Sequence, residues 1–362
     1  MSAYATKLNE AFAMKALKQF YNSAVAPKIT NNNYEGEVKD KSTKLNVLTF
    51  KKVALKAYSG ANMTADDLEE SNSILLTNQS RAFYFKVKTT DKLASFIKNP
   101  EGTVLEQVLN AHVEEVDTFV LGFYADAGAG SNYGTDYTTG TVTVDVTTGA
   151  VTGSGTTFTS GMVGKSFKAT GHTKWYRVKS QSSATAIVIE NDSDDETSAY
   201  DGGAITAGAT YTIQAVSAIQ TTASTIYGQF VKMGKMLDKN KIPKLGRTAT
   251  INSDILEVLL QSDKLTQAVE SQVSTTITNA KIGRVAGFDI YVSEQCDGDG
   301  VTGVHCVFSH PIGITFAESL TENQVENDII GNFGKAYKGL WVYGAKVADV
   351  NRGAIAHAWL KL

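Results

Sequence analysis

Cysteine is scarce in this chain: its 362 residues include two, Cys296 and Cys306. Two cysteines are too few for a disulfide framework, so the fold must depend on the burial of apolar side chains. The sequence also lacks a basic and then apolar leader at its start, and any run of about 18 apolar residues, the length that crosses a membrane. These absences predict a soluble protein, made in the cytosol of the producing cell, with no membrane partner.

A basic excess is missing too. The chain has 34 lysines and arginines against 37 aspartates and glutamates, a formal net charge of -3. Proteins that bind phosphate backbones usually carry a clear basic excess, so a specific nucleic-acid ligand is not expected. With 42% hydrophobic residues, a chain of this length can bury a sizeable core, and one large domain with a smaller one is expected.

The first part of the chain changes from a helical to a strand period. Residues 4–25 carry apolar side chains near helical spacing, which predicts a short amphipathic arm. Strand-like runs then take over. Two of them, 34–38 and 45–50, flank the polar stretch 39–42, which is expected to be the tip of a long hairpin. A hairpin of this kind has no core of its own and needs a neighbour to bury its apolar side.

A long helix is predicted next. Asn99, Pro100 and Glu101 combine an N-cap residue, a proline at the first helical position and an acid in the first turn. Apolar residues at the 3.6-residue period continue this helix to Tyr124.

The composition then shifts, because no leucine occurs between Leu121 and Leu237 while glycine, threonine and serine crowd residues 126–214. Helix formers give way to strand formers. Short alternating runs such as 140–146 and 186–189, with turn residues between them, predict a small all-β domain inserted into the larger fold.

Helical spacing returns at residues 219–237, and Asn252 ahead of an apolar run predicts the N-cap of a second helix. From Phe288 onward strand-like runs dominate. Separate runs of helices and strands indicate the α+β class rather than alternating βαβ units.

Five stretches outside the β insertion have distinctive sequences: Tyr34-Glu-Gly-Glu-Val38, Ala82 to Lys92, Met236 to Arg247, Gly283 to Ser293 and the aromatic-rich end. In these stretches and in the order of its expected helices and strands, the chain resembles the major capsid proteins of tailed bacteriophages (Caudovirales), with their Hong Kong 97-type fold. None of the stretches is a catalytic motif. The resemblance implies a shell subunit and no enzymatic activity.

The resemblance also implies a domain plan. It assigns residues 1–33 to an N-terminal arm, 34–60 to an extended loop, 61–125 with 340–362 to a peripheral domain with spine helix 99–124, 126–215 to the inserted all-β domain, and 216–339 to an axial domain. The arm and loop would contact neighbouring subunits. The expected contact residues are Leu8, Phe12, Leu17, Tyr21, Lys39, Lys41, Lys44 and Phe50.

Partners follow from the same resemblance. Many copies would form the hexamers and pentamers of an icosahedral head in the virion, assembled in the host cytoplasm around double-stranded DNA held non-specifically. An arm of this length leaves no room for a fused scaffolding segment, so a separate scaffolding protein is expected, with a portal protein as a further partner. Whether a decoration protein also binds stays open. Lysines near the arm and hairpin are expected to contact neighbours rather than DNA, because aromatic residues for base stacking are not interleaved with them.

Chemical motifs are weak. Gly161 to Ser166 resembles a phosphate-binding loop, but Thr159 stands where its first glycine is needed. Cys296, His305, Cys306 and His310 do not have the spacing of a structural zinc site. Asp297-Gly-Asp-Gly300 begins like a calcium loop, yet Phe308 occupies the position of its last ligand.

Two further groups of residues have the chemistry of a site. The acids Asp192, Asp194, Asp195, Glu196 and Asp201 could bind calcium but are more typical of a solvated loop. His112 and Glu115 lie one turn apart without a nucleophile or third ligand. No catalytic residue, cofactor or metal site is therefore predicted.

Two other structural roles stay open. A phage tail or decoration protein would form trimers, rings or tubes. An encapsulin-like compartment protein would enclose protein cargo and no DNA.

Overall fold

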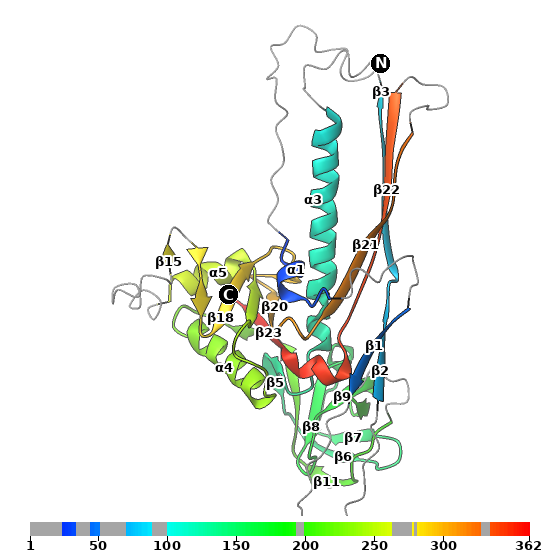
Figure 1. Cartoon of the computed structure of the whole chain (residues 1–362). Helices are drawn as coiled ribbons and strands as arrows, with labels where there is room; N and C mark the ends of the chain where they lie inside the picture. Colours follow the sequence, from blue (N-terminus) through cyan, green and yellow to red (C-terminus); the bar gives the residue numbers. More distant parts are fainter. Residues whose placement is uncertain are drawn as a thin grey trace, which may run out of the picture. The chain divides into compact units, whose positions relative to one another are not determined.

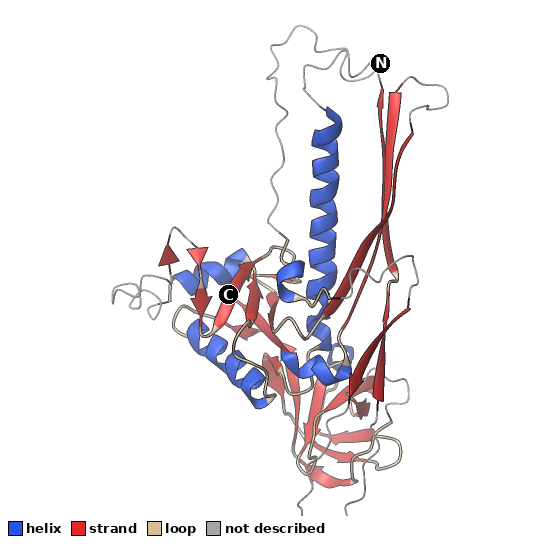
Figure 2. Ribbon diagram, viewed as in Figure 1, coloured by secondary structure: helices blue, strands red, loops and turns tan. Residues whose placement is uncertain are grey.

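The computed structural model describes residues 24–33, 44–50, 70–88, 100–192, 199–262, 277–278, 281–326 and 334–362. The chain divides into two compact units. The described residues within 32–115 and 315–346 belong to unit 1, and those within 23–31, 116–314 and 347–362 belong to unit 2. Strands dominate both units (Figure 2). No helix in the described part of the chain has the length and apolar character needed to cross a membrane.

Three long antiparallel strands form the main sheet of unit 1, here called the long-strand sheet (Figure 1). They are β21 (Thr315–Glu326), β22 (Gly334–Lys346) and β3 (Gln79–Lys88), with β22 in the centre. Phe85 lies opposite Tyr337 and Phe83 opposite Gly339. Residues directly opposite each other share a face of the sheet. One face is therefore aromatic, and the Phe83 ring covers the backbone of Gly339, where no side chain would fit.

The predicted long helix is confirmed as α3 (Pro100–Leu121), which continues into the 3-10 helix η3 (Gly122–Asp126). The part of α3 within unit 1 covers the aromatic face of the long-strand sheet. The His112 ring stacks on Trp341 of β22 with centroids 4.3 Å apart, and its Nε2 hydrogen-bonds to Glu318 of β21. His112 therefore has a packing role in unit 1.

A two-stranded antiparallel sheet of β1 (Lys44–Phe50) and β2 (Glu70–Leu76) also belongs to unit 1. The strand expected at 45–50 is present and pairs with 70–76, whereas its expected pairing with 34–38 stays a prediction. Such a pairing encloses a longer loop at little extra entropic cost, and nothing in the local pattern signals it. Residues 34–43, with the expected hairpin tip, lie outside the described residues.

Unit 2 contains a mixed sheet with strand order β13-β23-β20-β14-β18-β17. The strands on this path are β13 (Ile219–Gln220), β23 (Ile355–Lys361), β20 (Gly303–Ser309), β14 (Thr248–Ile251), β18 (Phe288–Val292) and β17 (Arg284–Val285). Two short strands, β4 (Asn132–Tyr133) beside β23 and β19 (Gly298–Asp299) beside β20, complete the sheet. Helices α4 (Ile226–Lys239) and α5 (Ser253–Leu260) belong to the same unit. Phe230 of α4 meets Phe308 edge to face at 4.9 Å, and Phe288 meets Phe308 at 5.2 Å, which makes a dry aromatic core.

Both helices near this sheet were expected, with one difference in bounds. Asn252 caps α5 by accepting a hydrogen bond from the Ile255 backbone N–H at 3.0 Å, as predicted. Residues 219–220 are strand β13 rather than the start of a helix, because they pair with β23 in parallel. The helix therefore begins at Ile226.

A second sheet of unit 2 has eight antiparallel strands and is here called the all-β sheet. The strands are β5 (Thr135–Tyr137), β6 (Thr141–Val144), β7 (Ala150–Ser154), β8 (Ser166–Ala169), β9 (Tyr176–Ser183), β10 (Ala186–Asn191), β11 (Ile205–Ala209) and β12 (Tyr211–Ser217). They enclose one buried cluster that includes Phe167, Tyr176 and Ile213. The strands predicted at 140–146 and 186–189 are present.

The last two strands of the chain, β22 and β23, belong to different units. β22 pairs with β3 in unit 1, whereas β23 pairs with β20 in unit 2. The structure thus groups residues 315–346 together and 347–362 elsewhere, while the expected domain plan places a boundary at 340. The arm, loop, peripheral, inserted and axial domains of that plan stay predictions.

Candidate assembly surfaces

Most of the contact residues expected from the sequence fall outside the described residues. These are Leu8, Phe12, Leu17, Tyr21, Lys39 and Lys41. Lys44 and Phe50 are the first and last residues of β1, and the structure does not describe their side chains. Their role at a subunit contact stays a prediction.

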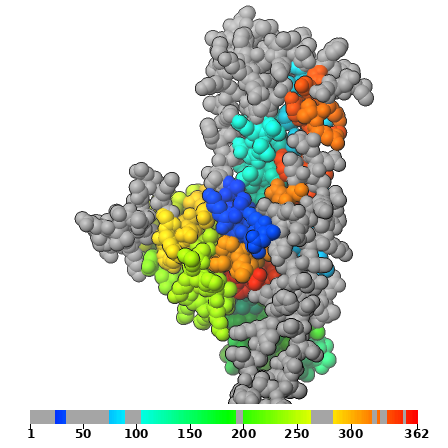
Figure 3. Space-filling model, in the orientation of Figure 1, coloured from blue at the N-terminus to red at the C-terminus, as the bar shows by residue number. Residues whose placement is uncertain are grey.

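The last part of the predicted arm, at Val25 and Ala26, is held by one carboxylate of α3. Asp117 is buried and accepts hydrogen bonds from the backbone N–H groups of Val25, at 3.0 and 3.1 Å, and Ala26, at 2.8 Å. Burial raises the pKa of Asp117, although these hydrogen bonds and the nearby Lys28 act in the opposite direction. Figure 3 shows the short helix α1 (Ala26–Ile29) in blue on the surface of unit 2.

This attachment is made on two sides. Ile29 is buried, and the Lys28 ammonium lies 5.2 Å from the centre of the Tyr291 ring, a cation–π distance. The backbone N–H of Asn31 also donates to the carbonyl of Ile314 at 2.8 Å. The structure therefore fixes where the chain leaves unit 2 toward its N-terminus.

Unit 1 exposes several large apolar side chains. Tyr84 is 61% exposed, on the opposite face of β3 from Phe83 and Phe85. Leu105 and Leu109, one turn apart on α3, are also exposed. Neighbouring apolar side chains in contact with water, such as Leu105 and Leu109, are typical of surfaces that bind other proteins.

Unit 2 has a cleft of about 470 Å³, here called the lysine cleft. Three lysines of α4 line one wall, and Tyr133, Trp175 and Gln214 contribute to the others. The full set of lining residues is Ala129, Gly130, Tyr133, Trp175, Gln214, Lys232, Lys235, Met236, Lys239 and Asn240. None of these is acidic, so the cleft has a positive charge in a chain whose net charge is negative.

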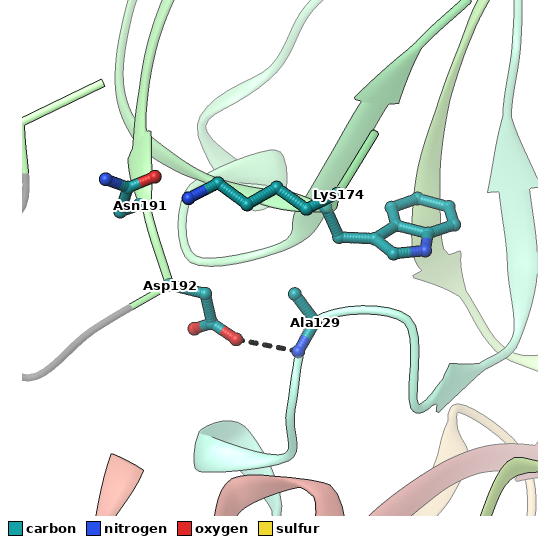
Figure 4. Close-up of a pocket in the computed structure, with 5 residues that line it drawn as sticks. Ala129, Lys174, Asn191 and Asp192 are labelled. Carbon is teal, nitrogen blue, oxygen red and sulfur yellow. Dashed lines mark hydrogen bonds between the residues drawn. The ribbon is translucent and has the colours of Figure 1, made fainter. Parts of the chain in front are cut away.

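A second pocket shares Ala129 and Trp175 with the lysine cleft (Figure 4). In this pocket Asp192 accepts a hydrogen bond from the Ala129 backbone N–H at 2.7 Å. Asp192 also forms ion pairs with Arg177 at 3.0 Å and Arg352 at 2.6 Å. Asp192, one of the acids considered as a calcium ligand, is therefore paired with two guanidinium groups.

The remaining acids of that group do not gather in the described residues. Asp201 pairs with Lys174 at 2.7 Å, and residues 194–196 lie outside the description. Within the described ranges, no three histidine, cysteine or acidic side chains are placed to hold a metal ion. Since three of the five acids lie outside the described residues, the structure does not test the calcium hypothesis.

The residues weighed as a zinc set form a different arrangement. His305 Nδ1 lies 2.8 Å from His357 Nε2, and the His305 ring stacks between Tyr124 and Trp359. Burial lowers the pKa of His305 to about 4 and that of His357 well below its usual value. Both imidazoles are therefore neutral near pH 7, and they connect β20, β23 and η3.

The cysteines stay separate from that pair. Cys296 and Cys306 are both buried as free thiols. Burial raises the pKa of Cys296 to about 12 and that of Cys306 well above its usual value, so neither is a thiolate. Sequence reasoning missed His357 and Tyr124, which lie far from His305 in the chain and carry no local signal.

No protein-family model and no curated protein matches this chain. Solved structures match it over nearly its whole length. A chain of Mycobacterium phage Che8 superposes with a TM-score of 0.60 at 16% identity, covering 96% of this chain and 96% of that one. The capsid structure of Cyanophage P-SCSP1u gives 0.58 at 10% identity, with 97% and 92% covered. The mature capsid of bacteriophage PhiM1 gives 0.54 at 11% identity, with 97% and 91% covered.

These likenesses concern the fold. They extend across the long helix, the long-strand sheet and the mixed sheet, since almost the whole length of each chain is matched. The α+β class and the phage capsid fold expected from the sequence are confirmed.

Proposed function

From this phage capsid fold, we propose that the chain is a major capsid protein whose copies assemble into the icosahedral head of a tailed phage. The near-complete coverage of both chains in the structural matches carries this proposal. A partial match would fit a shared domain in an unrelated protein. A match from end to end fits a shell subunit of the same construction.

The surfaces of the molecule support this role. Unit 1 exposes Tyr84, Leu105 and Leu109, and an isolated subunit would keep these apolar groups in water. Packing against neighbours in hexamers and pentamers would bury them, as expected for a protein that works by assembly rather than turnover. The chain is proposed to have no enzymatic activity.

Other components complete the proposed assembly. A separate scaffolding protein would guide closure in the host cytoplasm, a portal protein would occupy one vertex, and a decoration protein would bind the outside of the virion. Double-stranded DNA would fill the shell without sequence-specific contacts, consistent with the slightly negative net charge.

Electron microscopy tests the proposal directly. The chain is expressed alone and together with its genomic neighbours, and the products are separated by sedimentation. Closed shells of uniform diameter are expected. Tubes or small rings would favour a tail or decoration protein, shells with copurified protein cargo and no DNA would favour an encapsulin-like compartment, and monomers under both conditions would contradict the proposal.

A further inference from the structure

The lysine cleft combines three features that point to a ligand. Lys232, Lys235 and Lys239 recur at intervals of three and four residues, which puts their ammonium groups along one side of α4. The indole of Trp175 forms a flat wall of the cleft. It lies against Gly130, where an added Cβ would come within 2.8 Å of the ring. An extended anionic ligand with an apolar side chain fits this combination.

Gln214 provides the third feature. Its side chain lines the cleft and is 9% exposed, yet its buried Oε1 has no hydrogen-bond partner. A buried acceptor without a donor is costly, typically by about 1–3 kcal/mol. The ligand is therefore expected to bring an N–H or O–H group as well as negative charge.

This acceptor distinguishes between two anionic partners. The phosphates and deoxyriboses of a DNA duplex offer acceptors only, so they would leave Gln214 Oε1 unpaired. A polypeptide brings an N–H at nearly every residue, and its aspartates and glutamates suit the lysines. The cleft is better suited to an acidic peptide than to the packaged DNA.

The chain itself contains such a segment, Asp66-Asp67-Leu68-Glu69-Glu70, with four carboxylates around one leucine. An extended peptide advances about 3.3 Å per residue, so Asp66 and Glu69 would lie about 10 Å apart. The seven steps along α4 from Lys232 to Lys239 advance about 10 Å. The two rows of charge therefore match in length, and Leu68 would meet the aromatic wall.

We propose that the lysine cleft binds residues 66–70 of a second copy of this chain. The contact rests on the proposed function, since only an assembly of many copies supplies the segment at a fixed ratio. Ion pairs between the lysines and the carboxylates would set the register of the bound segment. A backbone N–H donated to Gln214 would favour a peptide over other anions.

Binding is tested with a fluorescent peptide of residues 63–72 and the full chain, kept below the concentration at which it assembles. Saturable binding is expected to weaken at least tenfold in Lys235→Glu/Lys239→Glu. The matched double substitution Lys241→Glu/Lys244→Glu, outside the cleft, should leave it nearly unchanged. Gln214→Leu, which keeps every charge, should weaken it about fivefold.

Three results of this titration would overturn the proposal. The first is equal affinity of the peptide for the cleft variant and the control variant. The second is a DNA duplex that binds more tightly than the peptide with the same lysine dependence. The third is binding only after residues 66–70 of the chain are replaced by glycine and serine, which would mean that its own segment fills the cleft.

A charge exchange tests the contact within the assembly. Lys235→Glu/Lys239→Glu and Asp66→Lys/Asp67→Lys should each reduce the yield of closed shells, and one chain with all four substitutions should recover much of it. Absence of recovery would contradict the contact. If the wild-type chain forms no shells, the proposed function fails, and the peptide titration still decides what the cleft binds.

Discussion

The all-β sheet of unit 2 and the long-strand sheet of unit 1 bury their apolar side chains in different ways. Strands of the all-β sheet surround their own cluster, in which Phe167, Tyr176 and Ile213 are almost fully buried. The long-strand sheet has α3 on one face, while Tyr84 on the other face is in water. The first sheet surrounds a core made by its own strands, and the second leaves a large aromatic side chain exposed on one face.

The largest effect is expected from the core of the all-β sheet. Phe167 is fully buried and stacks on Tyr211 with centroids 5.6 Å apart. Phe167→Ala should lower the free energy of unfolding by about 3–5 kcal/mol, because it leaves a cavity. Urea denaturation followed by tryptophan fluorescence measures the loss.

Tyr84→Ala is the matched aromatic truncation in the long-strand sheet. Its ring is mostly in water, so the free energy of unfolding of the free chain should change by less than about 1 kcal/mol. The yield of closed shells should fall much more. Equal losses of stability for the two variants would remove the contrast between the sheets.

A loss of stability smaller than that of Phe167→Ala is expected where α3 holds the segment at Val25 and Ala26. Asp117→Ala leaves two buried N–H groups without their acceptor, which should cost about 2–3 kcal/mol in urea denaturation. Thr118→Ala, an exposed neighbour, should cost under about 1 kcal/mol. Similar values for the two variants would show that the carboxylate does not anchor the segment.

The sequence predicted what depends on local pattern. The helix start at Pro100 and the cap at Asn252 follow from backbone N–H groups that need acceptors nearby in the chain, and both were found. The change to short strands followed from the absence of leucine between Leu121 and Leu237. Such features depend on a few adjacent residues.

Contacts between distant residues were not predictable in this way. The partner of β1 lies in residues 70–76, and the His305–His357 pair joins residues 52 positions apart. The lysine cleft needs Gln214 and Trp175 beside α4, which no spacing in the sequence specifies. These arrangements are set by how sheets pack, so local pattern alone cannot identify them.

The buried histidines give unit 2 a pH dependence. An unfolded histidine takes up its proton near pH 6.5, whereas the folded protein keeps the pKa of His305 at about 4 and that of His357 well below its usual value. Unfolding therefore takes up protons, and the free energy of unfolding should fall as pH drops from 6.5 toward 4.

His305→Gln isolates part of this effect. The carboxylates titrate alike in both proteins, so the difference between variant and wild type should shrink on acidification by on the order of 1 kcal/mol, allowing for the solvent contact of His305. Urea denaturation at several pH values measures it. A difference that is constant with pH would mean that these imidazoles do not titrate as described.

The smallest effect is expected from two exposed ion pairs, one in each unit. Arg81 pairs with Glu115 in unit 1, and Lys174 pairs with Asp201 in unit 2 at 2.7 Å; all four side chains are roughly half exposed. In the free chain, Arg81→Ala and Lys174→Ala should each cost no more than about 0.5 kcal/mol and lose that effect in high salt. The two variants should differ in assembled shells, because an ion pair that a neighbouring subunit covers is screened less by solvent. If unit 1 is completed by its neighbours, Arg81→Ala should lower the urea midpoint of shells more than Lys174→Ala does, and equal midpoints would indicate that the surface beside Arg81 stays in water after assembly.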